Sequence, residues 1–132
     1  MNFLINNNHT AFSYIGLLDD DILISVSDLN KILFIADVQK LDVFQASLTH
    51  DSYYQHRQFI HKAGYLVLPT HWVEIMAPFY SKDVFFEAGK DFNRSISGTG
   101  IDVYLIPTVQ VLLDKTNTVV VHAVQMKHCR PI

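Results

Sequence analysis

The chain has 132 residues, 49% hydrophobic and 17% charged, a balance that excludes a disordered protein and allows one domain with a real core. Its formal net charge of −3 provides no basic field for nucleic acid or anionic lipid. The only cysteine, Cys129, excludes an intrachain disulfide and therefore a secreted disulfide scaffold. No apolar run reaches the roughly 18 residues of a membrane span, and residues 1–10 lack the pattern of a secretory signal, so a cytoplasmic protein is expected.

The first half of the chain predicts a strand, a helix and a second strand. The apolar run at 12–18 is short and rich in aromatic and branched residues, which is typical of a buried strand. Ser25 or Ser27 can cap a following helix, in which apolar residues recur at helical spacing between 29 and 41. The segment 42–46 is the second strand. This order favours a parallel pair of strands with a right-handed crossover.

The middle of the chain predicts a loop and a hairpin. Residues 47–58 are polar and predict an ordered surface loop, the usual place for binding residues. Two apolar runs follow at 59–68 and 72–80, joined by a short Pro-Thr-His connection. The short connection predicts that they pair as an antiparallel hairpin.

The last part of the chain predicts two helices and a strand. Ser81 can cap a helix that ends near Gly89. A third helix is predicted at 101–113, with a kink or break at Pro107, and a β-branched strand at 117–124. The predicted fold class is therefore α/β, with a mixed β-sheet flanked by helices.

Three consecutive aspartates, Asp19, Asp20 and Asp21, stand at the end of the first predicted strand. Their carboxylates repel one another, and a divalent cation held by oxygen ligands is the simplest compensation. The alternative is that one aspartate caps the following helix and the other two are solvated. The triplet alone leaves the two interpretations level, because so short a motif often occurs by chance.

Five segments, taken in order, carry a resemblance to a known family. They are LLDDDI at 17–22, QASLTHDS at 45–52, WVEIMAPFYS at 72–81, SGTGID at 97–102 and HCRP at 128–131. Together they resemble a family of domains of unknown function from plants and bacteria, whose members are expected to be glycosyltransferases with the GT-A fold. The matches run from about Tyr14 to Pro131. The resemblance implies that residues 1–132 are a single domain equivalent to the C-terminal portion of a GT-A nucleotide-diphospho-sugar transferase, without the N-terminal nucleotide-binding units.

The resemblance implies a metal site. The aspartate triplet resembles the Asp-x-Asp motif of GT-A enzymes, in which Asp19 and Asp21, with Asp20 between them, would hold Mn²⁺ or Mg²⁺ against the diphosphate of a nucleotide-sugar. The HCRP segment resembles a His-Thr-Arg-Pro motif, and His128 would complete the metal site. The alternative for His128 is an exposed histidine near the end of the chain.

The resemblance also implies catalytic residues on the acceptor side. Asp102, in a segment similar to Ser-Gly-Trp-Gly-Leu-Asp, would be the general base or an acceptor contact, although Thr99 stands where the family has tryptophan. Glu74 would lie near the acceptor. From the spacing alone, a carboxylate that caps its helix and favours the dipole is the preferred interpretation of Asp102, and Glu74 must be either paired or exposed.

Further expectations concern the side chains outside this site. The aromatic residues Trp72, Phe79 and Tyr80 are expected in the core rather than as a sugar platform. His122 is expected as a satisfied residue of its strand.

The function that follows is metal-dependent transfer of a sugar from a nucleotide-sugar donor to an unidentified glycan or small-molecule acceptor. Only 18 residues precede Asp19, so the alternative is an inactive remnant, or a metal- or sugar-binding domain, of the same fold. A phosphohydrolase would need a second ligand cluster or a phosphate loop, which the sequence does not display. The missing units would expose the edge of the strand at 12–18, which predicts a homodimer or poor solubility.

Overall fold

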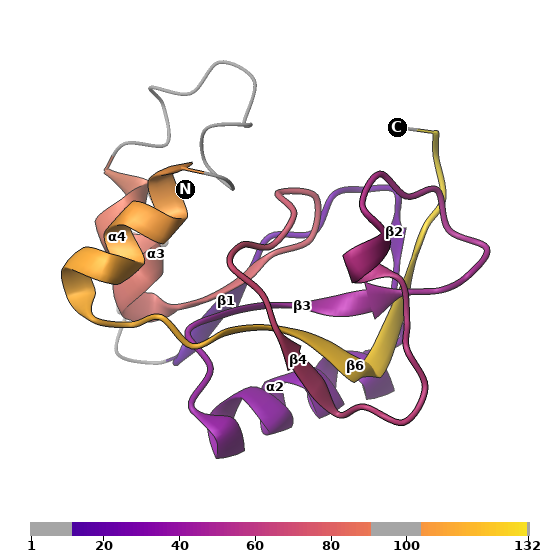
Figure 1. The fold of residues 1–132 in the computed structure, drawn as a ribbon, viewed down its shortest axis with the longest axis horizontal. Coiled ribbons are helices and arrows are strands. Elements are labelled where there is room, and N and C mark those ends of the chain that lie inside the picture. The colour runs from indigo at the N-terminus through magenta and orange to yellow at the C-terminus, as the bar shows by residue number, and fades with distance from the viewer. Residues whose placement is uncertain (1–11, 91–103, 132) are drawn as a thin grey trace.

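The computed structural model describes residues 12–90 and 104–131, which form a mixed β-sheet with helices on its flanks (Figure 1). The strands are β1 (Tyr14–Gly16), β2 (Ile22–Leu23), β3 (Val43–Leu48), β4 (Val67–Pro69), β5 (Phe79–Ser81) and β6 (Thr118–His128). The helices are α2 (Val26–Gln39), α3 (Lys82–Gly89), α4 (Ile106–Leu113) and the short 3₁₀ helix η1 (Arg57–Phe59). The predicted class, a mixed sheet flanked by helices, is confirmed. None of the helices in the described ranges is long and apolar enough to cross a membrane.

The sheet has the strand order β1-β5-β3-β6-β2, with β4 also paired to β6. The pair β3 and β6 is parallel, and the other pairs are antiparallel. Among the described strands, β1 therefore lies at one edge of the sheet, where the resemblance placed the run at 12–18.

Two predicted strand pairings are wrong. The strands near 12–18 and 42–46 are not neighbours, because β5 lies between β1 and β3. The runs at 59–68 and 72–80 do not form a hairpin, because β4 pairs with β6 while β5 pairs with β1 and β3. Apolar residues of these runs are buried in the core without belonging to long strands. Phe59, for example, lies in η1 and is fully buried.

Helix α2 follows its local sequence closely. The Ser25 hydroxyl oxygen accepts a hydrogen bond from the backbone N–H of Asp28 at 3.0 Å, which satisfies one of the free donors of the first turn. The helix buries Ile32, Ile35 and Ala36, and it is capped at its C-terminal end by Lys40, whose φ of 55° is left-handed. Helix α2 lies under the sheet in Figure 1.

Helices α3 and α4 pack side by side at one end of the sheet (Figure 1). Ser81 occupies the cap position of α3, without a side-chain capping bond, and the helix ends at Gly89 as predicted. Helix α4 begins at Ile106 with Pro107 in its first turn, where a missing N–H costs nothing. Of the predicted helix at 101–113, the part at 101–103 lies outside the described residues.

Strand β6 is longer than the predicted strand and contains an irregularity. Its register with β3 shifts, so that Ala46 pairs with Val121 whereas Ser47 pairs with Gln125. Residues 122–124 are therefore out of register, and the Ser47 hydroxyl donates to the Val124 carbonyl at 2.8 Å. Beyond this bulge, β6 continues to His128, where β2 joins it.

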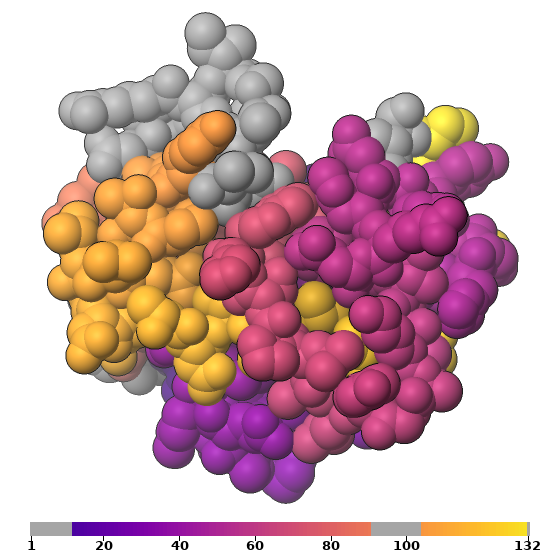
Figure 2. Space-filling model, viewed as in Figure 1, coloured from indigo at the N-terminus to yellow at the C-terminus, as the bar shows by residue number. Residues whose placement is uncertain are grey.

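The core has two parts. One lies where α2 packs against the sheet and contains stacked Phe44 and Phe79, whose ring centroids are 5.2 Å apart. The other lies under α3 and α4 and contains Tyr80 and Phe85. Phe79 and Tyr80 are thus core residues, as expected. In the space-filling view, α4 and the segment that includes β4 cover much of the face shown, and part of β6 is visible between them (Figure 2).

Candidate functional site

The aspartate triplet lies in the turn between β1 and β2. The backbone N–H of Asp19 donates to the Met76 carbonyl at 2.9 Å, and that of Leu17 donates to the Pro78 carbonyl at 3.0 Å. The N–H of Ile22 donates to the Asp19 carbonyl at 3.1 Å and closes the turn. The triplet is therefore attached to the segment that precedes β5.

His128, at the end of β6, meets this turn although it is 107 residues away from Asp21 in the chain. The imidazole Nε2 of His128 lies 2.9 Å from Asp21 Oδ2, and the side chains are 7% and 14% exposed. Two backbone contacts support the approach: Ile22 pairs with His128, and the N–H of Cys129 donates to the Asp21 carbonyl at 2.9 Å. Two of the three expected metal ligands are therefore in contact, and His128 is not an exposed terminal histidine.

Both nitrogens of the His128 ring face oxygen atoms that can only accept hydrogen bonds. Nδ1 lies 3.0 Å from the Tyr53 carbonyl, and Nε2 lies 2.9 Å from the Asp21 carboxylate. If Nδ1–H donates to the carbonyl, as is usual for a metal-bound histidine, a neutral ring turns the lone pair of Nε2 toward a carboxylate oxygen. Only a proton or a cation makes that approach favourable.

The described protein groups only partly balance the negative charge and the hydrogen-bonding capacity of the carboxylates in the triplet. Asp21 Oδ1 is buried without a hydrogen-bond partner in the described structure. Burial raises the pKa of the Asp19 carboxyl, and the charges of Asp21 and Asp20 raise it further, while His128 lowers it. A bound cation would relieve both effects, because it favours ionised carboxylates.

The third aspartate, Asp20, points to solvent. Its carboxylate lies 3.4 Å from the Arg130 guanidinium, and both side chains are exposed. Such an exposed pair contributes little to stability, so Asp20 is the member of the triplet least tied to the fold.

Divalent cations would fit the donor set in part. Neighbouring ligands on an octahedral ion with bonds of about 2.1 Å lie about 3.0 Å apart, close to the Nε2–Oδ2 separation at His128 and Asp21. Among the described residues, however, no three His, Cys, Asp or Glu side chains are grouped to hold a metal. Mg²⁺ commonly keeps several waters and takes phosphate oxygens from a substrate, so two protein ligands are compatible with it.

The polar loop contributes to the position of His128, which the sequence did not predict. Ser52 Oγ accepts from the backbone N–H of His128 at 3.1 Å, and the N–H of Tyr53 donates to the His128 carbonyl at 3.1 Å. The Thr49 and Ser52 hydroxyls are 2.8 Å apart and share a hydrogen bond. The sequence feature that could have pointed to Ser52 is the QASLTHDS segment, which is part of the resemblance but implied no role for Ser52.

Glu74 is buried, 7% exposed, in the irregular segment before β5. The amide of Gln45, in β3, binds both the backbone and the side chain of Glu74. The backbone N–H of Glu74 donates to Gln45 Oε1 at 2.7 Å, and Gln45 Nε2 donates to Glu74 Oε1 at 3.3 Å. Of the two alternatives that the sequence left for Glu74, paired or exposed, the structure shows the paired one, whereas the expected place of Glu74 in a strand is wrong. Asp102 and Thr99 lie outside the described residues.

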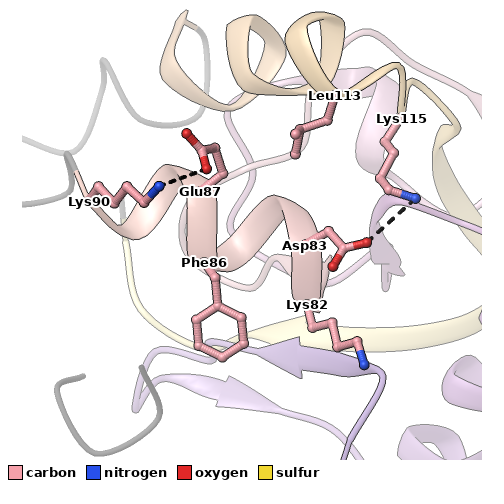
Figure 3. A pocket seen from close by; sticks show the side chains of 7 residues that line it. All are labelled: Lys82, Asp83, Phe86, Glu87, Lys90, Leu113 and Lys115. Atoms are coloured by element: carbon pink, nitrogen blue, oxygen red, sulfur yellow. Dashed lines mark hydrogen bonds and ion pairs between the residues drawn. The ribbon is translucent and has the colours of Figure 1, made fainter. Parts of the chain in front are cut away.

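A separate cavity of about 440 Å³ lies between α3 and α4 (Figure 3). Its acids are matched by its own lysines: Lys90 lies 2.9 Å from Glu87, and Lys115 lies 3.7 Å from Asp83. The third lysine of this cavity, Lys82, forms no ion pair among the described residues, so the lining carries one unmatched positive charge.

Comparison of the sequence with models of protein families and with curated proteins gave no match to either.

Proposed function

We propose that this chain is the metal- and acceptor-binding portion of a GT-A-like glycosyltransferase, which transfers a sugar from a nucleotide-sugar. The single observation that carries the proposal is the contact between Asp21 and His128, 2.9 Å apart with both side chains shielded. The resemblance implies a metal site of these residues, and nothing in their chain separation requires them to meet.

The arrangement of the other segments supports the same proposal. Four of the five resembling segments supply residues to two sets of contacts, one at the triplet and one around Glu74, two residues before Met76. These residues are Asp19 and Asp21 of the first segment, Gln45 and Ser52 of the second, Glu74 and Met76 of the third, and His128 of the last. An arrangement in which separate segments converge on shielded carboxylates is typical of a functional site.

The chemistry requires charge stabilisation at the leaving group. A divalent ion at Asp21 and His128 would neutralise the negative charge that develops on the diphosphate as its bond to the sugar breaks. The Tyr53 carbonyl orients the His128 ring, and Asp21 Oδ1 remains for a ligand. The exposed guanidinium of Arg130, beside Asp20, can donate to phosphate oxygens.

On the acceptor side, we propose that Glu74 contacts the acceptor, with Asp102 as the base that takes the proton of its hydroxyl group. Gln45 fixes the orientation of the Glu74 carboxylate, as a substrate-positioning residue requires. The carbonyl of Met76, close to Glu74 in the chain, is bonded to Asp19, which connects this segment to the proposed donor site.

An inactive domain of the same fold is the second candidate. The observation that favours it is that the Asp21–His128 contact coincides with the pairing of β2 and β6, so that it can act as a structural link between these strands. Metal binding without sugar transfer would support this candidate.

Calorimetric titration of Mn²⁺, with and without UDP, tests the proposal. We expect the chain to bind Mn²⁺, more tightly with UDP, and Asp21→Asn to abolish binding. Asp37→Asn, an exposed aspartate of α2, is the matched control and should leave binding unchanged. No binding by the unaltered chain, or equal binding by a folded Asp21→Asn variant, would contradict the metal site. Release of UDP from a panel of UDP-sugars then separates an active enzyme from an inactive domain.

A further inference from the structure

We propose that a second site, independent of the aspartates, binds an acidic saccharide such as a uronic-acid-containing oligosaccharide. The site is a cavity of about 370 Å³ beside β4, and its lining includes Gln58, Lys62 and Thr70–Trp72. Val120 of β6 also lines it, whereas His128 lies eight residues further along that strand. The volume is near the lower end of the range for small-molecule sites, which suits one or two sugar rings.

Trp72 provides the apolar part of the cavity. It is half-buried, and its indole packs edge-to-face with Phe59 at 5.1 Å and with His56 at 5.0 Å between ring centroids. These contacts hold the ring in place before a ligand arrives. Because the face of an aromatic ring is negative, it attracts the weakly positive C–H groups on the apolar face of a pyranose. The prediction that Trp72 is a core residue is therefore only partly right.

Gln58 and Thr70 provide a polar part that is also held in place. Gln58 Nε2 donates to Thr70 Oγ1 at 3.1 Å, and the Thr70 hydroxyl donates to the Trp72 carbonyl at 3.1 Å. Gln58 is exposed, and its carbonyl oxygen is left as an acceptor for a ligand hydroxyl group. A pyranose has apolar faces and a rim of hydroxyl groups, so a cavity with one apolar and one polar part matches its chemistry.

The charge of the cavity selects for an acidic sugar. Lys62 is the one lysine among the described lining residues, which include no carboxylate, and within the described part of the chain its ammonium forms no ion pair. The lining of the cavity between α3 and α4, by contrast, includes two carboxylates, Glu87 and Asp83, which lie 2.9 Å from Lys90 and 3.7 Å from Lys115. An unpaired cation beside an aromatic ring and an amide suits one carboxylate on a sugar ring.

A nucleotide is a weaker fit to the same residues. Its phosphates carry more than one negative charge and commonly bind to a helix N-terminus or to a run of backbone N–H groups. The described lining of this cavity offers Lys62 and the exposed His71 instead.

Trp72 is the only tryptophan of the chain, so its fluorescence reports directly on this cavity. We would titrate trigalacturonate and a hyaluronan tetrasaccharide, with cellotriose as the neutral sugar and UMP as the nucleotide, and follow fluorescence and heat in parallel. An acidic saccharide should give a saturable change in both signals and bind about tenfold more tightly than cellotriose. Added salt should weaken the binding.

Lys62→Gln should weaken this binding by about tenfold, because it removes the cation but keeps the backbone bond from Lys62 N–H to His122. Lys82→Gln, in the other cavity, is the matched control and should have no effect. Asp21→Asn and added Mn²⁺ should also leave saccharide binding unchanged, which separates this site from the proposed metal site. No saturable signal with either acidic saccharide, heat without a fluorescence change, tighter binding of UMP, or an unaffected Lys62→Gln variant would overturn the proposal.

Discussion

Replacement of Gln45 by leucine tests whether the buried pair with Glu74 holds the site together. Gln45 is completely buried, and its side chain both donates to the Glu74 carboxylate and accepts from the Glu74 N–H. Leucine removes both bonds, and also the bond from Gln45 Nε2 to the Ala46 carbonyl at 3.3 Å, while it roughly keeps the volume. A buried donor that loses its partner costs about 1–3 kcal/mol, and a bond to a charged group contributes about 1.5–3 kcal/mol. Because leucine recovers some stability by apolar burial, we expect a net loss of about 3 kcal/mol.

Urea unfolding, followed by Trp72 fluorescence, measures this loss. With a denaturant slope of about 2 kcal/mol/M, 3 kcal/mol lowers the unfolding midpoint by about 1.5 M at an unchanged slope. Glu74→Gln is the matched control, because it keeps an acceptor for Gln45 and leaves the backbone bond intact; we expect about 1 kcal/mol. If Gln45→Leu shifts the midpoint no more than Glu74→Gln does, the pair is not what holds Glu74, and the argument for its positioning fails.

Three further predictions concern stability. Burial, and then the charges of His61 and Lys62, lower the pKa of His122 below its usual 6.5, so the folded protein favours the neutral ring. The stability that the neutral ring contributes is present above pH 6.5 and is lost as the pH falls through the lowered pKa. The urea midpoint of His122→Gln should therefore fall less between pH 7.5 and 5.5 than that of the unaltered chain. Equal falls would refute this assignment. Ser25→Ala removes the cap of α2 and should cost about 1 kcal/mol in urea unfolding, whereas Ser27→Ala, inside the helix, should cost less. Gly16→Ala would place a Cβ 2.6 Å from the Phe79 ring, so a loss of about 1–3 kcal/mol is expected in thermal or urea unfolding, and an unchanged stability would show that the ring moves aside freely.

The helices were predictable because their signals are local. A serine cap, a helical apolar period and a glycine or left-handed end are contained within one segment, and α2 and α3 follow them. The strands were less predictable. The apolar runs at 59–68 and 72–80 each looked like one strand, yet each contributes only a short strand at its end, since irregular segments bury apolar side chains equally well.

The candidate site was predictable in its charged residues and not in its supporting ones. The aspartate triplet stood out because three carboxylates follow an apolar strand, whereas His128 was singled out only by the resemblance of the HCRP segment. Ser52 and Tyr53 gave no such signal, because their roles are backbone and hydroxyl bonds to a residue far along the chain. Gln45 was a weak signal that went unused: a polar residue in an apolar strand must be satisfied when it is buried.

By itself, the sequence determined the α/β class, the ends of α2 and α3 and the presence of an acidic triplet after a strand, because composition, periodicity and capping act over a few residues. The tertiary structure alone decided that β5 lies between β1 and β3, that Asp21 meets His128, and that Trp72 borders a cavity beside Lys62. These relations depend on which distant strands share hydrogen bonds. Which strands pair depends on how the whole sheet buries its apolar side chains, and this cannot be derived from any single segment.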